Sequence, residues 1–336
     1  MRRLLASIAA SAATVITAGA TLLTAATPAD ATSTAGATHA RAAASTASAA
    51  ENCVYGSISA RYDQLGGAAG KLGQPTSCEE PTERSTGRFT TFQRGAIYWS
   101  PGTGAWDVSG SFRELWLASG YENGTFGYPT SGEVPIKAGG VFQNYQGGTF
   151  YWSPAVGAHS LSGDFRRFYA SQGYENGYLG YPMTQEVPVR GGVFQVFEGG
   201  VLYWSPATGT HSVTGSFRGL YAAHGYENGE LGYPTSQEVR TRDGGVYQSY
   251  QGGTMYWAPG LSPQVVSGIF LSVYGRNGYE HGCLGFPLTE PYSYEGYSDV
   301  QEFQGGIIWS TPENGAFADL YPRDPNYSQW GLYPRC

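Results

Sequence analysis

The stretch GYENGYLGYP, residues 173–182, recurs down the chain with few changes. Near copies begin at Gly120, Gly225 and Gly278, and a weaker copy, GGAAGKLGQP, begins at Gly66. A constant period of 50 or so residues indicates one supersecondary unit per copy, so the sequence predicts a single domain of five repeats. The steps are 54, 53, 52 and 53 residues, counted between the apolar residues that open each LGYP-type turn: Leu72, Phe126, Leu179, Leu231 and Leu284.

Each copy predicts the same series of elements. In GSFRELWLASG, Phe112, Leu115 and Trp116 lie at i, i+3 and i+4, which is one face of a short helix ended by Gly120. The glycines and proline of the following turn favour a compact loop over helix. Next, GGVFQNYQGGTFYWSP (residues 139–154) predicts two strands around a tight turn, and a further short strand follows. The predicted fold is an α+β repeat of short helix, LGYP-type turn and β-hairpin.

The two terminal copies indicate how the array ends. An open solenoid needs polar terminal caps, but copies one and five keep the apolar helix face and the hairpin of the inner copies. We therefore expect five units arranged as a closed or nearly closed five-lobed disc.

The start of the chain predicts export. Arg2 and Arg3 precede an apolar, Ala-rich run, and Ala29 and Ala31 supply the small residues of a signal-peptide cleavage site. A retained membrane anchor is the alternative, but the run is rich in Ala and Thr and ends in a small-residue site. We expect a secreted protein, extracellular or associated with a cell wall, with no membrane insertion. The predicted segments are a signal peptide at 1–31, an Ala/Ser/Thr-rich flexible linker at 32–51 and the five-repeat domain at 52–336.

The composition excludes several partners. The formal net charge is −7, which disfavours nucleic acid and anionic lipid because both are negatively charged. Charged residues make up 13% of the chain and aromatic residues 15%, a balance that favours neutral ligands with apolar faces.

The four cysteines form an even set without a CxxC pair, which in an exported chain favours disulfides over metal. Local pairing would join Cys53 to Cys78 and Cys283 to Cys336, and would hold both ends of the array. The rival pairing joins Cys53 to Cys336.

The repeat resembles a known family, the LGFP repeats of actinobacterial cell-envelope proteins, whose motif stands intact as LGFP at residues 284–287. The resemblance covers residues 52 to 336. It implies a cell-wall attachment module of a kind often joined to mycoloyltransferases or amidases. It also implies a compact, five-lobed arrangement of five repeats. The chain shows no attached catalytic domain, so the resemblance leaves an enzymatic activity unsupported.

The turn and the hairpin supply the candidate ligand-binding residues. Aromatic faces can cover the C–H surfaces of a sugar, and Glu and Asn can bind its hydroxyls. The alternative is a solvent-facing turn whose carboxylate satisfies backbone N–H groups. In the hairpin, period two groups Trp152 with Phe150, which favours a core position for Trp152 and an outward one for Tyr151; Ser310, at the Trp position of copy five, argues the other way. The candidate set is Tyr121, Glu122, Asn123, Tyr174, Glu175, Asn176, Tyr226, Glu227, Asn228, Tyr279, Glu280, Tyr151, Tyr203 and Tyr256.

A second carboxylate recurs four residues past each proline and has the same two interpretations; this set is Glu79, Glu133, Glu186 and Glu238. Copy one carries Gly67 and Ala68 in place of Tyr and Glu, so we expect no ligand site in its turn.

Three functions remain open. The preferred one is a secreted, non-catalytic binding protein that attaches to bacterial cell-wall polysaccharide through repeated sites. The alternatives are a secreted hydrolase or esterase with an inter-repeat site, and a scaffold that binds another secreted protein. We expect no enzyme, because no GxSxG elbow and no polar constellation unique to one copy is present. We also expect no cofactor and no metal site.

Overall fold

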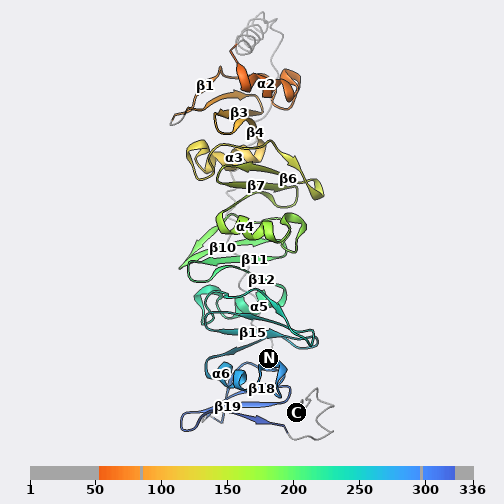
Figure 1. Ribbon diagram of the computed structural model, residues 1–336, viewed down its shortest axis with the longest axis vertical. Coiled ribbons are helices and arrows are strands. Elements are labelled where there is room, and N and C mark those ends of the chain that lie inside the picture. The colour runs from red at the N-terminus through yellow and green to blue at the C-terminus, as the bar shows by residue number, and fades with distance from the viewer. Residues whose placement is uncertain (1–52, 84–85, 296–297, 322–336) are drawn as a thin grey trace, which may run out of the picture. The chain divides into compact units, whose positions relative to one another are not determined.

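The computed structural model describes residues 53–83, 86–295 and 298–321, which form five consecutive units (Figure 1). The predicted signal peptide and linker lie outside these residues. Within the described ranges, no helix combines the length and the hydrophobicity that crossing a bilayer requires.

Each unit begins with a helix of nine residues. In α3, Phe112 and Trp116 are buried on one face, as their i, i+4 spacing predicts. The helix starts directly after an extended serine, Ser109, and stops before Gly120, which has a φ of 88° that an L-residue rarely adopts. The five helices are α2 (Gly56–Gln64), α3 (Gly110–Ala118), α4 (Gly163–Ser171), α5 (Gly215–Ala223) and α6 (Gly268–Arg276).

A single 3₁₀ turn follows each helix, where the sequence predicts only an irregular loop. The glycines that flank it confine it to three residues, because a Cβ on Gly124 would lie 1.7 Å from the backbone oxygen of Ser119. These turns are η1 (Gly67–Ala69), η2 (Tyr121–Asn123), η4 (Tyr174–Asn176), η5 (Tyr226–Asn228) and η6 (Tyr279–His281); η3 (Lys137–Gly139) is a separate turn within unit two.

The rest of each unit is a four-stranded antiparallel meander. The predicted hairpin forms its two middle strands and the predicted short strand its fourth; a first strand of two or three residues is an addition to the prediction. The five sheets are sheet one, β1 (Glu80–Pro81), β2 (Arg88–Phe92), β3 (Gly95–Ser100) and β4 (Gly104–Ser109); sheet two, β5 (Val134–Pro135), β6 (Val141–Tyr145), β7 (Gly148–Ser153) and β8 (Gly157–Ser162); sheet three, β9 (Val187–Val189), β10 (Gly192–Phe197), β11 (Gly200–Ser205) and β12 (Gly209–Thr214); sheet four, β13 (Val239–Arg240), β14 (Val246–Ser249), β15 (Gly253–Trp257) and β16 (Gln264–Ser267); and sheet five, β17 (Tyr292–Tyr294), β18 (Ser298–Phe303), β19 (Gly306–Thr311) and β20 (Gly315–Leu320).

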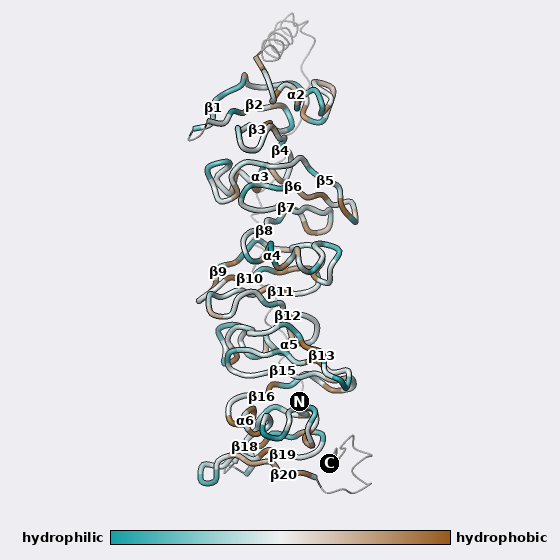
Figure 2. The backbone as a smooth tube through the Cα atoms, viewed as in Figure 1, coloured by the Kyte–Doolittle hydropathy of each residue, from teal (hydrophilic) through white to brown (hydrophobic). Residues whose placement is uncertain are grey.

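The first four sheets bury residues on both faces. On β7, Phe150 packs against the helix of its own unit, α3, whereas Tyr151 packs against α4 of the next unit. Hydrophobic stretches therefore recur in every unit instead of collecting in one part of the chain (Figure 2). The prediction that the hairpin tyrosines point outward is wrong: Tyr151, Tyr203 and Tyr256 are each only 4% exposed, while the neighbouring tryptophans are partly buried. The side chains do alternate between the two faces of the strand, but the face that the sequence assigns to solvent packs against the next unit and forms a second core.

Polar contacts also join consecutive units, and two of them involve Gln143 and Tyr181. The buried amide of Gln143 donates to the carbonyls of Asp107 in sheet one (2.7 Å) and Ser131 in its own unit (2.8 Å). The Tyr181 hydroxyl of the LGYP turn donates to the carbonyl of Lys137 in the preceding unit (2.6 Å). Its ring leaves room only for glycine at Gly140, where a Cβ would lie 2.2 Å from the hydroxyl oxygen.

Copy one departs from the repeat at both of these positions. It has Thr90 in place of the buried glutamine and Gln74 in place of the tyrosine of the turn. Within the described residues, no sheet precedes this unit, so neither side chain has one to contact there. The departures therefore follow from the position of the unit in the array.

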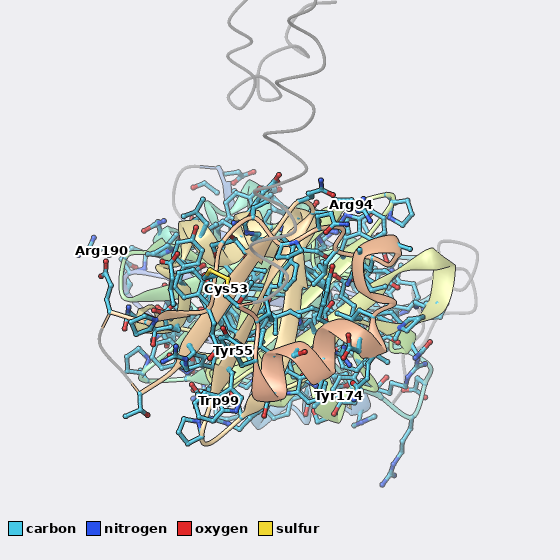
Figure 3. The ribbon with its side chains drawn as sticks, turned by 90° about the horizontal axis from the view of Figure 1, so that it is seen from above. Cys53, Tyr55, Arg94, Trp99, Tyr174 and Arg190 are labelled. Carbon is cyan, nitrogen blue, oxygen red and sulfur yellow. A yellow bond between two sulfur atoms is a disulfide. The ribbon has the colours of Figure 1, made fainter. Side chains whose placement is uncertain are left out.

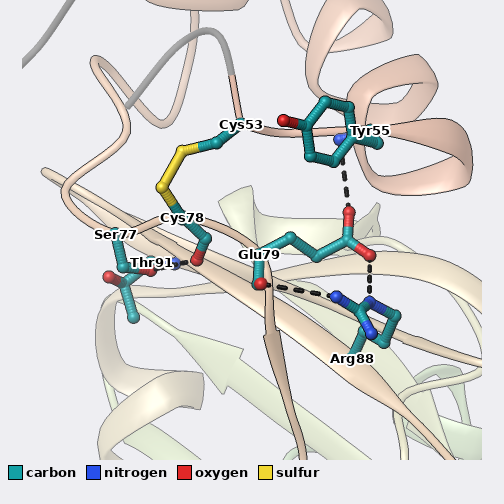
Figure 4. Close-up of a disulfide and its surroundings, with 7 residues drawn as sticks. All are labelled: Cys53, Tyr55, Ser77, Cys78, Glu79, Arg88 and Thr91. Carbon is teal, nitrogen blue, oxygen red and sulfur yellow. Dashed lines mark hydrogen bonds and ion pairs between the residues drawn. A yellow bond between two sulfur atoms is a disulfide. The ribbon is translucent and has the colours of Figure 1, made fainter. Parts of the chain in front are cut away.

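The predicted Cys53–Cys78 disulfide is present and connects the start of unit one to the loop after its turn (Figure 4). Beside it, Glu79 accepts from the Tyr55 backbone N–H and pairs with Arg88. The second predicted bridge involves Cys336, which lies outside the described residues.

The predicted closed disc is not confirmed. Each sheet has its own four strands, and in the described part of the chain no sheet closes. The hydrophobic clusters join the face of one sheet to the helix and sheet of the following unit. Units therefore associate through the faces of their sheets and not through the edge strands.

Candidate ligand-binding grooves

Pockets recur where a sheet meets the helix and the 3₁₀ turn of the next unit. We number these inter-unit grooves by the sheet that forms their floor. Groove two has a volume of about 570 Å³ and lies among β6, β7, α4 and η4. Grooves three and four have volumes of about 750 and 820 Å³. All three fall within the range of ligand pockets, roughly 300–1,000 Å³.

The grooves bring together candidate residues from two different repeats. Groove two is lined by Tyr151 of unit two and by Tyr174 and Glu175 of unit three. The same three positions line groove three, as Tyr203, Tyr226 and Glu227, and groove four, as Tyr256, Tyr279 and Glu280. At the first interface, the ring centroids of Tyr98 and Tyr121 are 6.5 Å apart, and the charge of Glu122 acts on Tyr98.

The turn tyrosines hold a strained backbone conformation. Tyr121, Tyr174, Tyr226 and Tyr279 have φ between 52° and 57°, where a side chain other than that of glycine costs about 1–2 kcal/mol. The equivalent residue of copy one is Gly67, with the same φ of 55°. The rings of Tyr174, Tyr226 and Tyr279 remain 46–49% exposed although their inner edges pack on a buried helix tyrosine. Three strained, half-exposed rings at one edge of the grooves indicate a role beyond packing.

The turn glutamates lie inside the grooves. Glu175 is 5% exposed and Glu280 is 4% exposed. Glu175 accepts a hydrogen bond from the amide of the adjacent Asn176 at 2.8 Å, and Glu122 and Glu227 are held by their own neighbouring asparagines, Asn123 and Asn228. In unit five His281 replaces the asparagine, and its Nε2 lies 3.2 Å from Glu280. In units two to four the asparagine amide therefore holds the carboxylate of the adjacent glutamate.

The floor tyrosines carry hydroxyls without a protein partner. Within the described ranges, the hydroxyls of Tyr151 and Tyr203 make no hydrogen bond to protein, although each residue is only 4% exposed. The buried polar atoms without a partner do not include these hydroxyls, so the hydroxyls are accessible from the groove. Burial raises the pKa of Tyr151, and the charge of Glu175 raises it further, so the hydroxyl keeps its proton and is available to donate. The same two causes, with Glu227, act on the pKa of Tyr203.

Arginines complete the grooves and were missed from sequence. Arg166 lines groove two and Arg218 groove three; Arg113 is their counterpart at the first interface. Tyr98 was also missed. The signal for both was present in the repeat, because Arg follows the helix phenylalanine in copies two to four and Tyr98 aligns with Tyr151. The sequence could not show that a turn faces the hairpin of the preceding unit and not its own.

The second set of glutamates has a structural role. Glu133 accepts from the Ser109 hydroxyl at 3.0 Å, and Glu186 from the Ser162 hydroxyl at 2.8 Å. Both serines are the residues that precede a helix, where a carboxylate favours the N-terminal end of the helix dipole. The residues that the structure describes contain no cluster of side chains suited to a metal ion.

The LGFP repeat matches the sequence four times, at residues 72–124, 126–177, 179–229 and 231–282. The chain belongs to the LGFP repeat family. Each match of this LGFP protein runs from one LGYP-type turn to the next YENG turn, so it ends within the tyrosine–glutamate turn of a groove. After the last match, the residues from Leu284 onward form sheet five of unit five, which has the same four-stranded order as the other sheets. No match to a curated protein was found.

Solved structures give only distant similarity. A streptogramin B lyase is 8% identical, with a TM-score of 0.13, over 74% of this chain and 69% of the lyase. The extracellular domain of a putative one-component system, BT4673, from B. thetaiotaomicron is 13% identical with a TM-score of 0.15, over 76% of this chain and 32% of that one. A hybrid two-component system domain from the same organism, BT3049, is 11% identical with a TM-score of 0.14, over 74% of this chain and 29% of that one. The LGFP chain thus spans about a third of these two domains, and scores this low support no argument about fold or function.

Proposed function

We propose that this LGFP protein is a secreted, non-catalytic binding protein that attaches to bacterial cell-wall polysaccharide through its inter-unit grooves. The observation that carries the proposal is the unpartnered hydroxyl of Tyr151, which lies in a pocket beside a carboxylate and a half-exposed ring. Tyr and Arg donors with Glu acceptors suit the hydroxyls of a sugar, and the exposed face of Tyr174 suits its C–H surface.

The repetition of the grooves supports a polymeric ligand. A chain that occupies several grooves at once gains effective concentration, on the order of 100-fold or more, without any new contact. Nearly equivalent environments also argue against catalysis, because an acid and a base need pKa values that differ. The disulfide is compatible with an extracellular protein, and the predicted signal peptide would deliver it there.

The test is co-sedimentation of the mature protein with purified, insoluble cell wall, before and after non-peptidoglycan polysaccharide is stripped from it. We expect retention on intact wall and loss on stripped wall. Retention on neither material would refute the proposal and favour a protein-interaction scaffold. Turnover of wall esters or glycans by the purified protein would favour the hydrolase alternative.

The chain offers a matched variant for the grooves. Replacing Tyr174, Tyr226 and Tyr279 together by Gly copies the natural state of copy one, so it removes the rings and also the steric cost of the positive φ. We expect wall retention to be lost while the protein stays folded by circular dichroism. Tyr55→Ala is the control, because Tyr55 is 60% exposed and lies outside the grooves. Full retention by the folded triple variant would show that the grooves are not the site.

A further inference from the structure

The grooves contain arginine side chains that no protein group neutralises. In the part of the chain that the structure describes, Arg113, Arg166 and Arg218 have no ion pair within 4.0 Å and no hydrogen bond, and the Nε of Arg113 is buried without a partner. By contrast, Arg167, one residue from Arg166, pairs with Asp164 on the same helix. A guanidinium is a five-fold donor that is always charged, so an unpaired one at a pocket is available to a ligand.

Arg166 and Arg218 line grooves two and three, and Arg113 lies near Tyr98 at the first interface. Copy one has Ser59 at the arginine position and Gly67 and Ala68 at the Tyr-Glu position, and no sheet precedes its helix in the described ranges. Copy five has Leu271 instead, but groove four gains Arg240 and Arg242 from the other side of the pocket. Among the described residues, neither Arg240 nor Arg242 forms an ion pair. Each of the three grooves therefore contains an arginine without an ion pair. In grooves two and three it comes from the helix, whereas in groove four it comes from the segment 240–242.

In grooves two and three, the arginine side chains are more accessible to a ligand than the glutamate side chains. Glu175 is 5% exposed and its carboxylate is held by Asn176, whereas Arg166 is half-buried and Arg218 is exposed. Elsewhere the chain is acidic, with 26 Asp and Glu against 19 Lys and Arg, so an anion is repelled by most of the surface. Paired donors of a guanidinium bind a carboxylate or a phosphate through two parallel hydrogen bonds, which are stronger than those to a neutral hydroxyl.

We infer that the grooves select an acidic saccharide, one that carries a carboxylate or a phosphate on its repeating unit, with Arg166, Arg218 and their counterparts binding that group. The turn tyrosine covers the sugar ring and the turn glutamate accepts its hydroxyls. The inference rests on the proposed function and narrows it to the charged polymers of a wall. It revises the expectation of a neutral ligand, which came from overall composition and took no account of local charge.

The test measures binding of the full mature protein to three soluble polymers: a polyuronate, a polyglycerol phosphate and neutral dextran. We expect binding to one or both acidic polymers that weakens as salt rises, and weak, salt-insensitive binding to dextran. The two acidic arms distinguish a carboxylate ligand from a phosphate ligand. Equal affinity for dextran and the acidic polymers would overturn the inference and leave the proposed function standing. Failure to bind any wall polysaccharide would instead overturn the proposed function.

Substitutions test whether the groove arginines are the residues that bind the acidic polymer. Arg166→Gln with Arg218→Gln should weaken binding to the acidic polymer by roughly 10-fold or more and weaken binding to dextran much less. The control, Arg190→Gln with Arg276→Gln, removes the same charge at exposed positions outside these pockets; Figure 3 shows Arg190 projecting from the edge of the molecule. Replacement of both groove arginines by Lys should restore part of the affinity, since the charge remains and the paired donors do not. An unchanged affinity in the Gln double variant, or an equal loss in the control, would refute groove recognition.

Discussion

The side-chain amide of Gln143 donates to the carbonyl of Asp107 at 2.7 Å, across the boundary between units one and two. Gln195, Gln248 and Gln301 make the same contact with the preceding sheet at 2.7–2.9 Å. All four are fully buried. Together with the hydrophobic clusters, this bond couples each repeat to its predecessor.

Replacing Gln143 by Leu should destabilise the boundary by about 2–4 kcal/mol, because the carbonyls of Asp107 and Ser131 and the hydroxyl of Tyr145 would lose a partner. Hydrogen exchange of the β4 and β6 amides measures this. Thr90→Val is the matched control at the same position of copy one. The Thr90 hydroxyl is buried without a partner, so its loss should be neutral or slightly stabilising. A large loss from Thr90→Val would contradict the account.

Because Tyr174 has a positive φ, we expect its Gly variant to be more stable than its Ala variant. Gly and Ala both remove the ring, but only Ala keeps the steric cost of a positive φ. Tyr174→Gly should therefore be more stable than Tyr174→Ala by about 1 kcal/mol in thermal unfolding. The converse change, Gly67→Ala in copy one, should cost a similar amount although the site has open space around it. Equal stability of the Gly and Ala variants would show that the turn relaxes.

His224 should make stability depend on pH. Burial lowers its pKa, but the hydrogen bonds and charges of Glu290 and Glu230, both 2.8 Å away, outweigh burial and raise it above the ordinary 6.5. A raised folded pKa stabilises the protein fully below about pH 6.5, and the effect is lost as pH rises through the folded pKa. His224→Gln should thus cost more stability at pH 5.5 than at pH 8 in urea denaturation.

His159 should give the opposite dependence of stability on pH. Burial lowers its pKa despite a hydrogen bond to the Val156 carbonyl. The folded chain therefore binds this proton less readily than the unfolded chain, and stability falls as pH drops through 6.5. His159→Gln should relieve that loss in acid. The same pH trend in both variants would rule out this assignment.

The Cys53–Cys78 disulfide should stabilise unit one locally. A separation of 25 residues corresponds to roughly 3–4 kcal/mol in the chain-entropy description. Replacing both cysteines by Ser should increase hydrogen exchange in α2 and β2, while α4 and sheet three change little, because repeats couple mainly to their neighbours. Equal loosening of all units would indicate that the array unfolds as one cooperative block.

The sequence by itself determined the number of repeats and their helix, turn and hairpin, and it left two disulfide pairings open. These follow from short-range chemistry: glycine at positive φ, i, i+4 apolar spacing and strand alternation act within a single copy. Tertiary structure alone decided which surfaces meet. Whether Tyr151 faces water, and whether Tyr174 faces its own hairpin or the preceding one, depends on how one unit stacks on another. A single repeat carries the same residues under either arrangement, so the grooves, and the arginines in them, emerge only when sheet faces are paired.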